Sequence, residues 1–179
     1  MSKKRKHTSR IEHKAEQQTL FNLDEEPKES DILETEESPR PSDSVKKAQA
    51  YLKKWKYDIG ENGVDGIYGE DTRKALISYM QHSLNAYKAD ISVDGIYGDE
   101  TAKALHARLP IGIGSTDTYL IKSIQLALLC HAMPLGWSGG IDGVYDYEFT
   151  ASTVEAFQKE NHISPSGIVD SVTIAKLFE

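Results

Sequence analysis

Apolar residues recur every three or four positions along several stretches of the chain. Spacing of this kind places the apolar side chains on one face of an α-helix, toward a core. These stretches lack the alternation of apolar and polar residues that is typical of half-buried strands. The pattern therefore predicts an all-α fold. The positions on which it rests are Val45, Ala48, Leu52, Trp55, Leu76, Tyr79, Met80, Leu84, Ile121, Ile124, Leu128, Val154 and Phe157.

A short motif is repeated between these stretches. Residues 64–72 read VDGIYGEDT, and residues 93–101, which begin 29 positions later, read VDGIYGDET. Weaker copies occupy residues 141–146 and 165–170. Each copy leads into a threonine that precedes an apolar residue by four positions. The chain is thus built from four units, each a loop followed by a helix.

A longer period groups the four units into two domains. We predict one domain at residues 43–109 and a second at 118–179, which we call the first and second repeat. Residues 110–117 form a linker whose proline and two glycines break helix and strand patterns. Each repeat would hold three helices, and packing the two together would help because a core of about 60 residues is marginal. The residues that correspond at a constant offset are Val45, Ala48, Gln49 and Leu52, and Ile121, Ile124, Gln125 and Leu128.

The Asp-Gly pair of the motif favours a tight turn. Glycine tolerates a positive φ, and the aspartate carboxylate accepts hydrogen bonds from amides two residues on. Acidic residues then fall in the first helical turn, where the helix dipole favours negative charge; these are Glu70, Asp71, Asp99 and Glu100. Two interpretations stay open: the motif is a folding device alone, or it also contacts a ligand.

Residues 1–42 differ in composition from the rest of the chain. They hold few large apolar side chains, and a basic block is followed by an acidic one, which predicts a disordered, solvated tail. The formal net charge of -7 argues against a nucleic-acid partner, since phosphate contacts need a surplus of Lys and Arg. The sequence contains neither the apolar core of a secretory signal nor a run long enough to span a membrane. We therefore expect synthesis in the cytoplasm and no membrane span.

Residue types that carry catalysis are scattered along the chain. The 6 histidines include no pair at the i, i+4 spacing of a helical zinc site. Glu70 and Asp71 are neighbours at a helix start and are not opposed across a cleft, as a glycosidase would require. We expect Cys130 to be buried and His131 to lie at the surface. The sequence predicts no catalytic residue, no metal site and no cofactor, and hence a protein that is not an enzyme.

The combination of these features resembles the peptidoglycan-binding domain that accompanies the catalytic domain of bacterial and phage cell-wall hydrolases. The resemblance implies three-helix domains that hold peptidoglycan noncovalently, by its glycan strand or stem peptide, and keep a neighbouring lytic domain on its substrate. Three substitutions depart from the family pattern in the second repeat, Asp146, Ser166 and Asp170, and imply that it binds less well or only scaffolds the first. The residues that carry the resemblance are Gln49, 65–69, Thr72, 94–98, Thr101, Leu105, Gln125, 142–145, 154–158, Gly167 and Ile168.

The chemical groups of peptidoglycan indicate which residue types could contact it. Sugar rings stack on aromatic faces, and stem peptides need polar partners. For Tyr68, Tyr97 and Tyr145, packing in the core is the competing interpretation. The predicted ligand-binding residues are Trp55, Tyr57, Asp65, Tyr68, Asp94, Tyr97, Trp137, Asp142, Tyr145 and Tyr147.

The leading functional hypothesis is noncatalytic binding of peptidoglycan that targets or anchors a lytic enzyme or an envelope or phage assembly. The alternative is a structural or interaction protein, for example a component of a phage particle, whose tail docks a protein partner. Residues 17–21 of that tail, QQTLF, are similar to short peptides that bind bacterial sliding clamps. A hydrolase fragment is a third hypothesis. We expect the site of action to be the cell wall or a phage particle.

Overall fold

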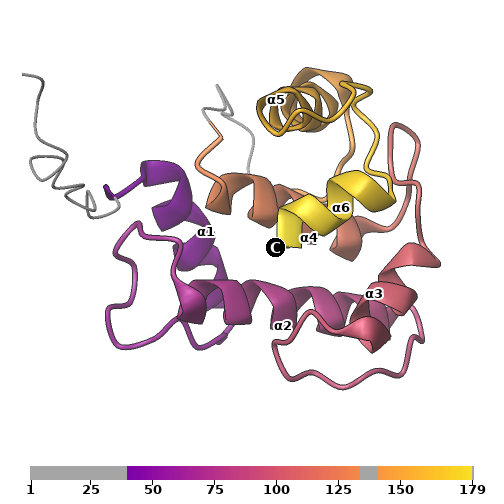
Figure 1. Ribbon diagram of the computed structural model, residues 1–179. Helices are drawn as coiled ribbons and strands as arrows, with labels where there is room; N and C mark the ends of the chain where they lie inside the picture. Colours follow the sequence, from indigo (N-terminus) through magenta and orange to yellow (C-terminus); the bar gives the residue numbers. More distant parts are fainter. Residues whose placement is uncertain (1–39, 134–140, 179) are drawn as a thin grey trace, which may run out of the picture. The chain divides into compact units, whose positions relative to one another are not determined.

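The computed structural model describes residues 40–133 and 141–178 (Figure 1). Loops separate the helices in this part of the chain, which confirms the predicted all-α fold. The elements are α1 (Asp43–Lys54), α2 (Glu70–Ala86), α3 (Asp99–His106), α4 (Thr118–Cys130), the π-helical turn η2 (Tyr147–Ala151), α5 (Ser152–Glu160) and α6 (Ser171–Phe178).

Part of what the sequence predicts lies outside the described residues. This is true of residues 1–39 of the predicted tail, including the peptide at 17–21, and of Trp137. The disorder of the tail and its docking to a partner therefore stay predictions.

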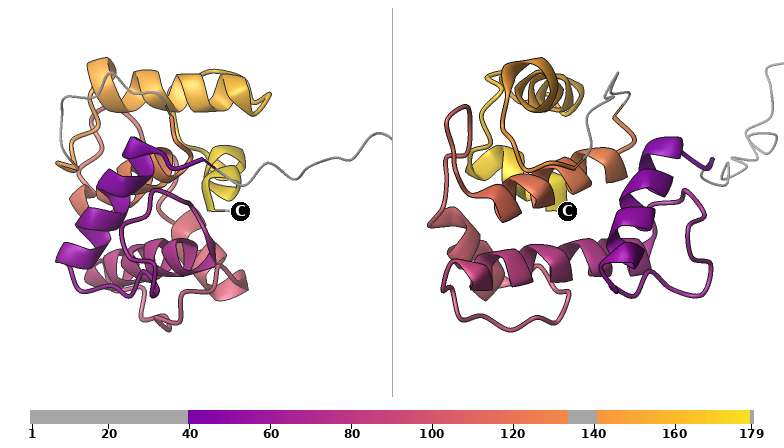
Figure 2. Two further views of the ribbon diagram at one scale, coloured as in Figure 1. Left: turned by 90° about the vertical axis from the view of Figure 1, so that its left-hand side faces the viewer. Right: turned by 180° about the vertical axis from the view of Figure 1, so that it is seen from behind.

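The helices of the first repeat pack directly against those of the second. Helix α4 contacts α1 and α2 of the first repeat as well as α5 and α6 of its own. In the views of Figures 1 and 2, α4 and α6 lie between α2 and α5. The described residues form one compact unit, and nearly all of their buried apolar side chains belong to one core. Each repeat thus gains buried surface that its own short helices could not provide.

The apolar stripes of the sequence face this core, with one exception. Val45, Ala48 and Leu52 on α1 are buried, as the periodicity predicts. Trp55 is 56% exposed, so its predicted place in the core stripe is wrong. The reason is local: α1 ends at Lys54, and Trp55 is the C-cap residue, with φ -90° and ψ 14°. Beyond a helix end, the helical spacing no longer determines where a side chain points.

A β-bridge joins the linker to the second repeat. Ile111 and Val169 exchange two backbone hydrogen bonds, of 3.0 and 2.9 Å, and both side chains are buried. The peptide bond between Leu109 and Pro110 is cis.

The end of α6 is attached to the first repeat. The buried ring of Phe178 stacks on Tyr97, with ring centroids 6.0 Å apart and planes 9° from parallel. Its carbonyl oxygen accepts a 2.8 Å hydrogen bond from Nη2 of Arg73. The last helix of the second repeat therefore packs on residues of the first, although Phe178 lies 81 positions from Tyr97 and 105 from Arg73 in sequence.

Candidate functional site

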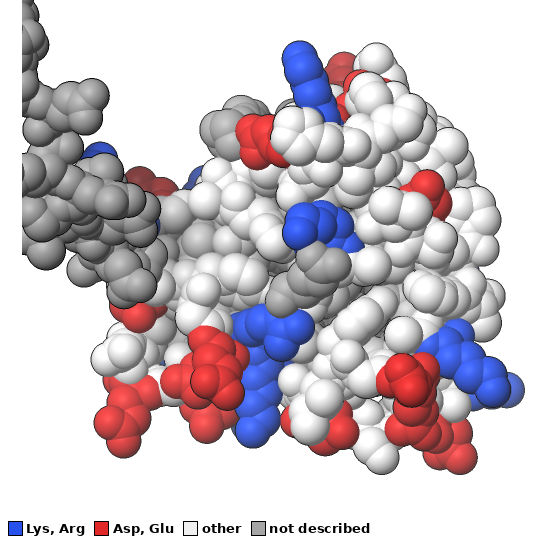
Figure 3. All heavy atoms as spheres, in the orientation of Figure 1, with Lys and Arg blue, Asp and Glu red and all other residues white. Residues whose placement is uncertain are grey.

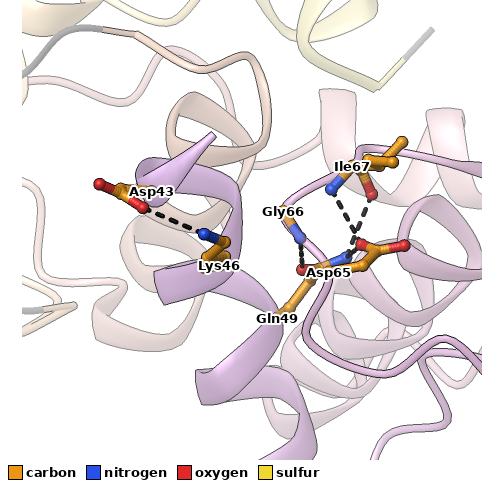
Figure 4. A network of polar contacts seen from close by, with 6 residues as sticks. All are labelled: Asp43, Lys46, Gln49, Asp65, Gly66 and Ile67. Carbon is orange, nitrogen blue, oxygen red and sulfur yellow. Dashed lines mark hydrogen bonds and ion pairs between the residues drawn. The ribbon is translucent and has the colours of Figure 1, made fainter. Parts of the chain in front are cut away.

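Each of the four loops that carry the repeated motif is organised by one buried glutamine. On α1, Oε1 of Gln49 accepts a 2.8 Å hydrogen bond from the amide of Gly66. Its Nε2 donates to Oδ1 of Asp65 at 2.7 Å, to the carbonyl of Ile67 at 3.1 Å and to Oγ1 of Thr72 at 3.0 Å. Figure 4 shows Gln49 reaching from α1 into the loop that carries Asp65, Gly66 and Ile67. The side-chain amide thereby supplies the hydrogen bonds that the backbone groups of the loop would have in a helix or a sheet.

The same arrangement recurs at the other three loops, around Gln81, Gln125 and Gln158. All four glutamines are at most 1% exposed, so their amides depend on these partners. The partners are Asp94, Gly95, Ile96 and Thr101 for Gln81; Asp142, Gly143, Val144 and Thr150 for Gln125; and Ser166, Gly167, Ile168 and Thr173 for Gln158. We call each of these sets a glutamine network.

The glycine of each network is required by the backbone. Gly143 has a φ of +79°, and a Cβ atom there would lie 2.7 Å from the carbonyl oxygen of Thr118. The equivalent glycines, Gly66, Gly95 and Gly167, also have positive φ. Glycine is therefore present because the chain turns sharply against the preceding helix.

The aspartates of the loops take part in the same networks. Oδ1 of Asp65 also accepts from the amide of Ile67 at 2.9 Å, and Oδ1 of Asp94 does so from Ile96. The hydrogen bonds from Gln49 and Gln81, followed by those from the backbone, hold the pKa of these two carboxyls below the usual value. One oxygen of each aspartate thus serves the fold, while ligand contact by Asp65, Asp94 and Asp142 stays a prediction.

The three tyrosines of the motif pack inward. Tyr145 is 4% exposed and donates its hydroxyl to the carbonyl of Gly167 at 2.8 Å. Tyr68 and Tyr97 are half-buried against the core, the first edge-on to His131. Burial raises the pKa of all three hydroxyls. Their rings contribute to packing, and ligand contact by them is a prediction that the structure leaves open.

Two of the predicted contact residues, Trp55 and Tyr57, meet in a cleft of about 270 Å³. The cleft lies where α1, α2 and α4 come together, and we call it the aromatic cleft. The hydroxyl of Tyr57 forms a 2.9 Å hydrogen bond with Nδ1 of His82 at its edge. The lining residues are Tyr51, Trp55, Tyr57, Tyr79, His82, Ser83, Ala86, Tyr119 and Lys122.

Tyr147 lies elsewhere, in the π-helical turn η2. It is 65% exposed and lines a separate cleft of about 390 Å³ with Ile113 of the linker and Ile168. The structure therefore does not bring the predicted contact residues together at one place.

Comparison with known families decides what these repeats are. The model of the family described as "Putative peptidoglycan binding domain" matches residues 41–105 and again residues 120–177. The chain belongs to this peptidoglycan-binding domain family. No curated protein and no solved structure matches the chain. The general function of such a domain is peptidoglycan binding, and the family resemblance predicted from the sequence is confirmed.

Each peptidoglycan-binding domain of this chain contains two glutamine networks. Gln49 and Gln81 lie in the first match, and Gln125 and Gln158 lie in the second. The repeated motif is therefore the structural framework of the domain. In the described part of the chain, no helix is long and apolar enough to cross a bilayer.

The departures of the second peptidoglycan-binding domain from the family pattern change how its helices begin. In the first domain, Gly69 and Gly98 are N-cap residues without a side-chain bond. In the second, Oδ1 of Asp146 accepts from the amides of Phe149 and Thr150 at 2.8 and 3.1 Å. Asp170 does the same for Thr173, at 2.8 Å. The aspartates thus cap helices, which is a role that glycine cannot fill.

Sequence reasoning missed several residues of the aromatic cleft. Tyr51 precedes Trp55 by one helical turn, and Tyr79 precedes His82 by three residues, so helical spacing could have indicated both pairs. Tyr119 had no such indication, because it comes from the second repeat. Its place in the cleft depends on how α4 packs against α1 and α2.

Proposed function

We propose that the chain binds peptidoglycan without catalysing a reaction on it, and thereby targets or anchors a lytic enzyme or an envelope or phage assembly. The observation that carries this proposal is the pair of matches to the peptidoglycan-binding family, which together span both repeats. The glutamine networks support it, since they account for the repeated motif as framework and leave exposed side chains for contact with the polymer.

The surface favours contacts of short range. On the face drawn in Figure 3, acidic and basic side chains are interspersed, and large areas between them are uncharged. A binding mode that depended on a broad field of one sign would be strongly weakened by salt. For this chain we expect stacking and hydrogen bonding to dominate, so binding to the wall should change little between low and physiological ionic strength.

Co-sedimentation of the full chain with purified sacculi tests the proposal. We expect the chain to pellet with the sacculi at low and at physiological salt. In parallel, a gel containing embedded cell wall should show no clearing by the isolated chain. A chain that stays in the supernatant would refute the binding, and clearing of the gel would refute the absence of catalysis.

A structural role is the second candidate function. It is favoured by the basic block followed by an acidic block at the start of the sequence, a pattern typical of interaction segments. In that case the chain would be a stable component of a purified envelope or phage particle and would have no affinity for isolated wall material. Particle composition, measured beside co-sedimentation, separates the two functions.

A further inference from the structure

We propose that the aromatic cleft binds a sugar unit of the glycan strand, and that the two repeats together form this one site. The proposal rests on the proposed function and specifies which part of the polymer is bound and where. The lining residues that carry it are Trp55, Tyr57, Tyr79, His82, Tyr119 and Lys122.

The cleft is built by both repeats. Tyr51 lies on α1, Trp55 is the C-cap residue of that helix, and Tyr79 lies on α2. All three belong to the first family match. Tyr119 and Lys122 lie on α4, the first helix of the second repeat. Because α4 contacts both α1 and α2, the three helices meet along this cleft. Neither repeat alone has the complete set of lining side chains.

The aromatic rings hold one another in place. Tyr51 lies 5.9 Å from Tyr79 and 6.2 Å from Trp55, measured between ring centroids. Tyr57 lies 5.5 Å from Tyr79, edge to face. Tyr79 is 7% exposed and forms the floor of this cluster. A site whose rings are already fixed loses little conformational entropy when a ligand arrives.

Two large aromatic side chains at the cleft remain open to solvent. Trp55 is 56% exposed and Tyr119 is 51% exposed, so the core does not account for them. Exposed aromatic faces beside a concave surface are typical of ligand sites. The apolar face of a sugar ring can stack on such a side chain.

The polar groups of the cleft suit a sugar better than a stem peptide. A hydrogen bond joins the Tyr57 hydroxyl to the His82 ring at the edge of the cleft. These groups can form hydrogen bonds with the hydroxyl and acetamido groups of a sugar. Lys122 is the one Lys or Arg in the lining, which includes no Asp or Glu. By contrast, the cleft beside α3 is lined by Lys88, Glu100, Lys103 and Arg108, a set better matched to peptide charges.

The size of the aromatic cleft also fits a single sugar unit. Its volume of about 270 Å³ lies just below the common size range for small-molecule sites.

The aromatic side chains are not required by the repeated fold. Tyr51, Trp55 and Tyr57 follow Gln49 by two, six and eight positions; the residues at the same distances from Gln125 are Ala127, His131 and Met133. The second repeat forms the same glutamine network without these three aromatic residues. The glutamine network therefore does not require these aromatic residues, and their presence in the first repeat alone predicts one glycan site per chain.

The test uses the full chain and two probes from the same sacculi: glycan strands stripped of their stems, and the released stem peptides. The variants are Trp55→Ala on the first repeat and Tyr119→Ala on the second. Val172→Ala is the control, because it shortens a comparably exposed apolar side chain outside the cleft, on α6. The dissociation constant for glycan should rise roughly tenfold in each cleft variant, as for a central aromatic contact, and stay within about twofold in the control.

The outcomes separate this inference from the proposed function. If the wild-type chain fails to pellet with sacculi, the proposed function fails. If it pellets but both cleft variants bind glycan as tightly as the wild type, the site assignment is overturned. If the stem peptides bind and the stripped strands do not, the assignment to sugar is overturned. Both substituted side chains are half-exposed, and thermal unfolding of each variant should match that of the wild type.

Discussion

At the scale of single residues, the glutamine side chains determine the loops. Each buried amide satisfies several groups at once, so its loss leaves a loop amide without a partner and takes one hydrogen bond away from a threonine hydroxyl. The sequence shows these glutamines at equivalent positions, but it does not show that they bond to the following loop. That link is long-range: 13 to 17 positions separate the partners Gln81 and Asp94, and Gln49 and Gly66.

Replacement of Gln81 by methionine tests the network. The change keeps the size of the side chain and removes the hydrogen bonds to Gly95 and Thr101. We expect the free energy of unfolding to fall by about 2–3 kcal/mol, measured by urea titration. An exposed residue of α3 gives the control: His106→Met should change stability by less than about 0.5 kcal/mol. Equal effects of the two changes would show that the network contributes little.

The carboxyls of the loops predict how stability depends on pH. The pKa values of Asp65 and Asp94 are lowered in the folded state, so the unfolded chain binds protons first on acidification. Their contribution is fully present above the ordinary carboxyl pKa of about 3.9. It is lost as the pH falls through the lower pKa of the folded state. Urea unfolding should show less of this acid-induced loss in a double Asp65→Asn, Asp94→Asn variant; an unchanged pH profile would contradict the account.

At the scale of elements, the sequence predicts which face of each helix is buried, but it predicts the residues at the helix boundaries less well. Helical periodicity places the buried faces of α1, α2, α4 and α5 correctly, because that spacing reports local geometry. It fails at Trp55, which lies past a helix end. Asp146 is a second example: as a departure from a family pattern it suggested weaker binding by the second repeat, and the structure shows it as a capping side chain.

Two glycines of one loop should respond in opposite ways to the same substitution. Gly98 is an N-cap with an ordinary φ of -100° and open space around its Cβ position, so Gly98→Asp should stabilise the fold by about 0.5 kcal/mol. Gly95 has a φ of +73°, and a Cβ there would lie 2.9 Å from the carbonyl oxygen of Lys74. Gly95→Asp should therefore destabilise by about 2 kcal/mol or more. Thermal unfolding of both variants measures the difference, and the same sign for both would contradict the explanation.

At the scale of the whole molecule, the sequence predicts the number of repeats but not how they share a core. His131 illustrates this. From its neighbours in sequence we expect a surface position, but its ring is half-buried, packs against Tyr68 and Phe157 and bonds to the carbonyl of Leu177. The prediction for His131 is wrong because helix periodicity does not show which helices meet. The prediction that Cys130 is buried is confirmed, and burial raises the pKa of its thiol.

A shared core predicts that the two repeats unfold together. Phe178→Ala removes a buried ring from the contact between α6 and Tyr97, and should cost about 3–5 kcal/mol. The variant should still show one transition when unfolding is followed by probes placed in each repeat. Two separate transitions in the wild type would show that the repeats fold independently.

The most direct test of the account is a titration of the isotope-labelled full chain with stem-free glycan strands, followed by amide resonances. We predict the largest shifts at residues 51–57, 79–86 and 119–122 and at the Trp55 indole, with small shifts at loop residues 65–67, 94–96 and 142–144. Shifts concentrated on those loops, or no shift at saturating glycan, would contradict a single glycan site formed by both repeats.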